Sequence, residues 1–125
     1  MGFSLFRKKV QPAMGSCEAN NGVRAQLARM GDDGVAVRHV VHYAYPDPDA
    51  DLTARADLVT ALKARGYEVS DAVNLNGVVF EHYRSVAPAD FDAVTTELKD
   101  WFAARGWDYD GWECAVVQPG ARTAH

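Results

Sequence analysis

The sequence predicts one α+β domain of the ferredoxin-like class, with its elements in the order β-α-β-β-α-β. Two strand–helix–strand units follow each other, and their helices end alike, at Ala64-Arg65-Gly66-Tyr67 and, 40 residues later, at Ala104-Arg105-Gly106-Trp107. In each case a glycine stops the helix and an aromatic residue starts a strand. One hairpin joins the units, and right-handed crossovers place both helices on one face of a four-stranded antiparallel sheet. The first and third strands are expected to be central neighbours.

A short N-terminal helix is expected before the first unit. Asn20 is expected to cap it and Gly31 to end it, since apolar residues recur between them at helical spacing. The predicted division of the chain is a flexible N-terminal segment (residues 1–19), a single domain (20–118) and a flexible tail (119–125).

The first unit is expected to hold a strand over residues 35–45 and a helix that stops at Gly66. In the strand the odd positions are apolar apart from His39, so they are predicted to form its buried face. Residues 46–49 end the strand and open the helix, because proline and carboxylates suit a first turn. The buried side of the helix is predicted to consist of Leu52, Ala56, Val59 and Leu62.

The second unit is expected to follow a strand over residues 67–73 and a turn at 74–77, where Asn and Gly tolerate positive φ. A third strand over residues 78–86 then leads to a helix with Pro88 in its first turn and to a last strand over residues 107–117. The apolar stripe of that helix is predicted to be Phe91, Val94, Leu98, Trp101 and Phe102.

Composition and charge exclude several classes of protein. A formal net charge of -4 argues against nucleic acid as the main partner and is compatible with a basic protein partner. Cys17 and Cys114 are isolated and lack metal-ligand spacing, so both are expected to be reduced, in a cytoplasmic protein. Residues 1–9 have too short an apolar run for a signal peptide or a membrane span. They are interpreted as a frayed terminus rather than a surface anchor.

Two histidines on the central strands are candidates for a metal site or an acid–base pair. His42 lies on the first strand and His82 on the adjacent third strand, so the two can approach each other across the sheet. No third ligand falls at a metal-like spacing, and two unrelated sheet histidines bonded to water or backbone are the favoured interpretation. No metal and no cofactor are therefore expected.

The last strand carries an acidic group beside a tryptophan. Asp108 and Asp110 are two positions apart and point to one side of an extended strand. Glu113 falls on the opposite side unless Gly111 introduces a bulge, and the face that Trp112 occupies depends on the same point. A tryptophan beside carboxylates is typical of an interface anchor with a charged rim, which favours protein contact over catalysis. An acidic strand entrance that contacts nothing is the simpler alternative.

These residues together resemble the regulator of ribonuclease activity B family. The similarity spans Asn20 to Val116 and is carried by Gly31-Asp32-Asp33-Gly34, His42-Tyr43-Ala44-Tyr45-Pro46, Ala64-Arg65-Gly66-Tyr67-Glu68-Val69 and Asp108-Tyr109-Asp110-Gly111-Trp112-Glu113. The resemblance implies a ferredoxin-like sandwich and a cytoplasmic bacterial protein that binds the endoribonuclease RNase E and inhibits it without doing chemistry. Members of the family are often strongly acidic, whereas this chain is only mildly so.

The leading hypothesis is a non-catalytic, protein-binding regulator whose partner is RNase E or another basic protein, acting as a monomer or weak homo-oligomer away from membranes. Its candidate interface consists of Asp32, Asp33, Asp108, Asp110, Trp112 and Glu113. The second hypothesis is a small-molecule-binding sensor domain that uses the open sheet face or a dimer cleft. The third is a metal-dependent enzyme built on His42, His82 and the Asp108–Asp110 pair.

Overall fold

The computed structural model describes residues 17–117. Along the chain its elements are α2 (Cys17–Arg29), β1 (Arg38–Pro46), the 3-10 helix η1 (Leu52–Ala54), α3 (Arg55–Ala64), β2 (Glu68–Asp71), β3 (Val78–Arg84), α4 (Pro88–Ala103) and β4 (Trp107–Cys114). The flexibility predicted for residues 1–16 and 118–125 lies outside the described residues. Residues 17–19 were predicted to belong to the flexible segment, but they form the first turn of α2.

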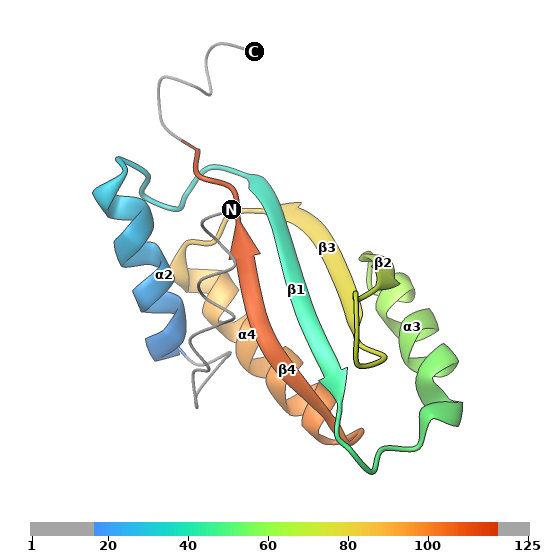
Figure 1. The fold of residues 1–125 in the computed structure, drawn as a ribbon. Coiled ribbons are helices and arrows are strands. Elements are labelled where there is room, and N and C mark those ends of the chain that lie inside the picture. Colours follow the sequence, from blue (N-terminus) through green and yellow to red (C-terminus); the bar gives the residue numbers. More distant parts are fainter. Residues whose placement is uncertain (1–16, 118–125) are drawn as a thin grey trace.

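The four strands form one antiparallel sheet in the order β2-β3-β1-β4. The first and third strands are central neighbours, as predicted. Figure 1 shows α4 behind β4 and β1, α2 beyond the β4 edge, and α3 beside β2 at the other edge. The prediction of an α+β domain with a four-stranded antiparallel sheet is therefore confirmed.

One face of the sheet, which we call the covered face, packs against all three helices. Its first cluster joins Leu58 and Leu62 of α3 and Leu98 and Phe102 of α4 to Ala44, Val78, Phe80, Trp107 and Tyr109. Its second joins Val23 and Leu27 of α2 and Phe91 of α4 to Val40, Val86, Trp112 and Cys114. Burying one such large apolar side chain stabilises the fold by about 1.5–3 kcal/mol. The opposite face of the sheet, the open face, is contacted by none of these helix residues.

The buried side of β1 is the reverse of the predicted one. The inward side chains are those at even positions, Arg38, Val40, His42 and Ala44, whereas the odd positions are half-buried. The odd positions are the more apolar, but the helices lie over the even side, where the two polar residues find partners inside the protein. Val35 and Val37 precede the strand and are 59% and 67% exposed.

The first two helices begin at other residues than predicted. Asn20 is fully buried inside α2 and does not cap it. The first unit's helix opens at Asp51, whose side chain accepts a hydrogen bond from the Thr53 amide at 3.0 Å. With this later start, Leu58 and Leu62 face the core, while Leu52 is 43% exposed and Ala56 is also exposed.

The ends of the helices and the start of α4 agree with the sequence. Gly66 and Gly106 follow α3 and α4 with φ of 99° and 75°, which only glycine adopts without strain. Pro88 occupies the first turn of α4. The predicted stripe of that helix is confirmed, with Val94 and Trp101 half-buried at its edges.

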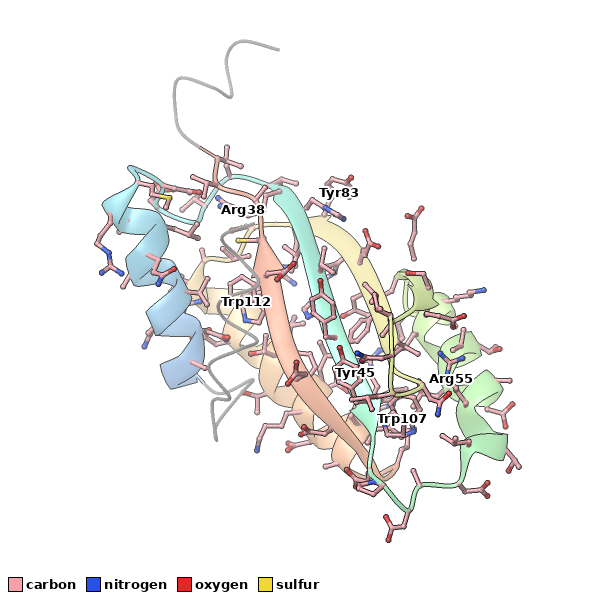
Figure 2. The ribbon with its side chains drawn as sticks, in the orientation of Figure 1. Arg38, Tyr45, Arg55, Tyr83, Trp107 and Trp112 are labelled. Carbon is pink, nitrogen blue, oxygen red and sulfur yellow. The ribbon has the colours of Figure 1, made fainter. Side chains whose placement is uncertain are left out.

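The β2–β3 hairpin turns differently from the prediction. Its positive φ angles are at Leu75 and Asn76, at 60° and 57°. Gly77 is required for another reason, because a Cβ there would lie 2.4 Å from Cδ1 of Tyr45. Arg55 holds the turn, donating to the carbonyl oxygens of Asn76 at 3.0 Å and Gly77 at 2.9 Å. Figure 2 shows Arg55 and Tyr45 at this end of the sheet.

Candidate functional site

A bulge at Gly111 decides which side chains of β4 face outward. The register of β4 against β1 shifts between Tyr43 and Ala44, and Gly111 has a φ of 109°. Residues before and after the bulge therefore differ in phase: Trp107 and Tyr109, then Trp112 and Cys114, point into the core. Asp108 and Glu113, five positions apart, share the open face.

The open face is defined by the outward side chains of the four strands. These are His39, Val41, Tyr43 and Tyr45 of β1, Glu68 and Ser70 of β2, Val79, Glu81 and Tyr83 of β3, and Asp108 and Glu113 of β4. Four of them are carboxylates, and among these strand positions there is no lysine or arginine. The face is therefore acidic and partly aromatic.

Three of the carboxylates lie in a single row across the sheet, which we call the acidic row. Glu68 of β2 is the register partner of Glu81 of β3. Glu81 is the partner of Val41 of β1, and Val41 is in turn the partner of Glu113 of β4. Like charges placed directly opposite each other on neighbouring strands destabilise a sheet. The row therefore concentrates negative charge that does not help the sheet to fold.

The neighbours of the acidic row are a histidine and tyrosines. His39 Nε2 lies 2.5 Å from Glu81 Oε1, and its ring stacks on Tyr83 with centroids 5.0 Å apart. Tyr43 donates its hydroxyl to Glu113 Oε2 at 3.0 Å. The other carboxylate oxygen of Glu113 is buried and has no hydrogen-bond partner among the described residues. Tyr83 is 72% exposed, so the row is flanked by accessible apolar surface.

Trp112, predicted as an interface anchor, lies in the core. It is 3% exposed and meets Phe91 edge to face with ring centroids 4.6 Å apart. Its indole Nε1 donates to Asn20 Oδ1 at 2.7 Å, and the amide of Asn20 donates to Thr95 Oγ1, also at 2.7 Å. Trp112 therefore fastens α2 and α4 to β4. Figure 2 shows it beside β4, on the side of α2 and α4.

Asp32 is also buried, in a bidentate ion pair with Arg38. The two side chains are 1% and 0% exposed, and Arg38 Nη2 donates to Asp32 Oδ1 at 2.9 Å. The amides of Gly34 and Val117 donate to the same carboxylate at 2.9 and 2.7 Å. Burial opposes ionisation of Asp32, but these hydrogen bonds together hold its pKa at about 2. Asp32 thus joins the loop before β1 to the chain after β4.

The remaining predicted site residues lie in different parts of the structure. Asp33 is exposed on the loop before β1, where its Oδ1 accepts from the Val35 amide at 3.0 Å. Asp110 is half-buried at the bulge. Asp108 is exposed opposite Tyr45, and burial of its carboxyl, with Asp47 nearby, raises its pKa. The structure thus gathers Asp108 and Glu113 on the open face, and their role in binding remains a prediction.

The two histidines meet, so the favoured interpretation of two unrelated sheet histidines bonded to water or backbone was wrong. His42 Nε2 lies 2.9 Å from His82 Nε2, and His42 Nδ1 lies 2.7 Å from the Tyr109 hydroxyl. Burial, then the neighbouring charges of His82 and Arg84, keep the pKa of His42 well below 6.5. Burial and Arg84 lower that of His82 to about 4. Both rings are neutral near pH 7 and form a hydrogen-bonded chain with Tyr109.

The Asp108–Asp110 pair does not join these histidines in a metal site. Asp108 lies on the open face, whereas His42 is on the covered face. Between residues 17 and 117, no three His, Cys, Asp or Glu side chains are grouped as metal ligands. No helix in the same range is long and apolar enough to cross a membrane.

Sequence reasoning missed most of the acidic row. Glu68 and Glu81 belong to different strands from the acidic motif of β4, and neither stands in an acidic cluster along the chain. Only the register, which places Val41 between Glu81 and Glu113, brings the carboxylates together. Finding the row also required knowing which side chains of β1 point outward. The apolar odd positions of β1 indicated the wrong face, because they were predicted to be buried.

Comparison with known families identifies the family of this chain. The family model described as regulator of ribonuclease activity B matches residues 17–114. The match starts at the first residue of α2 and ends at the last residue of β4, so it includes all three helices and the whole sheet. No curated protein matches the chain.

Proposed function

Because the chain belongs to the regulator of ribonuclease activity B family, we propose that it binds RNase E and regulates it without catalysis of its own. The binding surface in this proposal is the open face, with the acidic row at its centre. The cytoplasm, where this ribonuclease acts on RNA, is the proposed location. The strand order and the two crossover helices support a ferredoxin-like classification.

The observation that carries the proposal is the placement of Glu68, Glu81 and Glu113 in one row of the sheet face that the helices of residues 17–117 do not cover. Glu68 and Glu81 repel each other in the free protein, and a cationic partner relieves that repulsion on binding. The tyrosines beside the row supply the apolar contact that anchors an interface.

The charge of the described residues also supports a basic partner. Residues 17–117 contain nine lysines and arginines and all 17 of the chain's carboxylates, which gives this part a formal charge of -8. The net charge of -4 for the whole chain includes cations outside it. The domain is therefore more acidic than the whole chain indicates, and a charge of this size speeds association with a cationic surface.

The interface proposed here changes the role of two residues. Asp32 and Trp112 contribute by holding the loop and the helices in place, since both are buried. Asp108 and Glu113 contribute to contact directly. Asp33 and Asp110 belong to the proposed interface only as its margin, because they lie on the loop before β1 and at the bulge.

The test is the affinity of the full chain for purified RNase E, measured by calorimetry at low and at raised salt. The double variant Glu81→Gln, Glu113→Gln removes two charges from the row and keeps an acceptor for the hydroxyl of Tyr43. We expect about tenfold weaker binding, a change of about 1.4 kcal/mol, and a smaller dependence on salt. Inhibition of RNA cleavage should weaken in parallel.

The matched control is Asp90→Asn, Asp100→Asn, which removes two exposed charges from α4. We expect it to change the affinity by less than about twofold. Equal losses in the two variants would contradict the site. Absence of binding at low salt would contradict the choice of RNase E as the partner.

A further inference from the structure

The first residues of the chain match the open face in both charge and apolar character. Residues 1–16 contain Arg7, Lys8 and Lys9 and no carboxylate, so their side chains carry a formal charge of +3 against -8 for residues 17–117. Phe3, Leu5 and Phe6 immediately precede these cations. The regulatory function proposed above does not explain this motif.

The acidic row presents carboxylates with which the cations of such a segment can pair. Glu68 and Glu81 stand opposite each other, and among the described residues His39 is the only basic side chain in contact with Glu81. Glu113 has one buried carboxylate oxygen without a hydrogen-bond partner in residues 17–117. A lysine or an arginine laid along the row relieves the repulsion between Glu68 and Glu81, whereas the buried oxygen of Glu113 only adds to the negative charge there.

The apolar part of the segment also has a counterpart. Tyr83 is 72% exposed, and Val41 and Val79 are half-buried beside the row. A phenylalanine packed there removes apolar area on both surfaces from water, which favours the contact. Aromatic residues next to cations thus meet tyrosine and valine next to carboxylates.

The start of α2 is close enough for this contact. Asn20 bonds to Trp112 of the edge strand β4 from the covered face, and Cys17 lies three residues, about 4.5 Å along α2, before that contact, so the preceding segment reaches the open face by passing the β4 edge. Residues 10–16 span about 23 Å when extended, at about 3.3 Å per residue. Four strands at about 4.8 Å spacing span about 14 Å, so residues 3–9 can reach every strand of the open face.

We propose that residues 3–9 of this chain lie across the open face, with Arg7, Lys8 and Lys9 on the acidic row and Phe3 and Phe6 against the neighbouring tyrosines. The segment and RNase E then compete for one surface. Only this competition rests on the function proposed above. The contact itself is a property of the free chain.

Zero-length cross-linking of the full chain tests the contact without the nuclease. A carbodiimide joins a lysine amine to a carboxylate that it touches, and mass spectrometry of the monomer fraction identifies the pair. We expect Lys8 or Lys9 joined to Glu68, Glu81 or Glu113. The variant Phe3→Ala, Phe6→Ala keeps both lysines and should lower the yield of these links about threefold or more, since it removes the apolar contact.

Three outcomes would overturn the proposal. The first is linkage of Lys8 and Lys9 to Glu97 and Asp100 on α4 in equal or higher yield, which would place the segment on that acidic helix instead. The second is linkage only between two copies of the chain. The third is a yield on the acidic row that the phenylalanine substitutions leave unchanged.

Competition is tested by the affinity for RNase E of the variant Arg7→Gln, Lys8→Gln, Lys9→Gln. Freeing the open face should raise the affinity about three- to tenfold, because only the uncovered fraction of the protein binds. An unchanged affinity, alongside the expected cross-links, would overturn the competition. Failure of RNase E to bind any form would contradict the proposed function and leave the cross-links as evidence for the contact.

Discussion

The two faces of the sheet differ in how completely their charged and polar groups are paired within the protein. On the covered face, Asp32 is paired with Arg38, and His42 bonds to both Tyr109 and His82. On the open face, two glutamates of neighbouring strands oppose each other, and one oxygen of Glu113 has no partner in the described chain. Buried polar groups stabilise a fold only when they are satisfied. The covered face thus pairs its buried polar groups within the fold, whereas the open face keeps two opposed glutamates and one carboxylate oxygen without a partner among the described residues.

β4 contributes to both faces because of its bulge. Without the extra residue at Gly111, strand alternation would place either Trp112 or Tyr109 on the open face. With it, both aromatic side chains are buried and Glu113 is turned outward. Trp112 and Glu113 are neighbours in the sequence and look like one site there. In the structure the tryptophan is buried in the core and the carboxylate lies on the open face.

The largest expected effect separates these two neighbours. Trp112→Ala removes a buried ring that packs on Phe91 and leaves Asn20 Oδ1 without its donor. We expect the free energy of unfolding to fall by about 3–5 kcal/mol. Glu113→Gln, one residue along, keeps an acceptor for the hydroxyl of Tyr43 and should change it by about 1 kcal/mol or less. Urea unfolding followed by circular dichroism measures both.

The expected difference between Trp112 and Glu113 is contradicted if Trp112→Ala unfolds at nearly the same urea concentration as the parent chain. In that case the indole would not be holding α2 and α4 to the sheet. A loss in Glu113→Gln as large as that in Trp112→Ala would also contradict the division, because it would give the half-buried carboxylate the same structural role as the core tryptophan.

The sequence predicted the fold well because several local signals agree with one another. The glycine after each long helix, Pro88 at the start of α4 and the apolar stripe of that helix all indicate the same elements. The phase of β1 was predicted wrongly because Val41 and Tyr43 are more apolar than Arg38 and His42. Burial of those two polar residues depends on partners far along the chain, Tyr109 among them, which periodicity does not reveal.

The candidate site was harder to predict because it is a product of register. Glu113 was identified from its position beside Trp112, but Glu68 and Glu81 enter the site only through pairing across three strands. The acidic loop was identified by its carboxylates, yet Asp32 is buried and only Asp33 is exposed. Residue type indicated charge, and only the tertiary structure separates carboxylates that are paired inside the fold from those that remain at the surface.

A smaller effect is expected from acid, and it belongs to the covered face. His42 and His82 have lowered pKa values in the folded protein, about 4 for His82, against 6.5 for an ordinary histidine. Between pH 6.5 and 4 the unfolded chain therefore binds more protons, so the free energy of unfolding falls as the pH falls. Above pH 6.5 both states hold neutral rings and this dependence disappears.

Urea unfolding midpoints at pH values across this window measure the effect, and His82→Gln is the variant that sharpens it. Removing one titrating ring should flatten the pH dependence by about one proton. The contribution of Asp32, whose pKa is about 2 in the folded protein, is lost only as the pH falls from 3.8 towards that value. An unchanged slope in His82→Gln would mean that its pKa is not lowered by folding.

The smallest expected effect is a gain in stability on the open face. Glu68 is exposed and stands opposite Glu81, so Glu68→Gln removes a repulsion across two strands and should raise the free energy of unfolding by about 0.2–1 kcal/mol. The gain should shrink in high salt, which screens the repulsion. Ser70→Gln, at the next outward position of β2, changes no charge and should show no salt-dependent gain. A fall in stability in Glu68→Gln would mean that the carboxylate is already satisfied within the chain, and the open face would lose its contrast with the covered one.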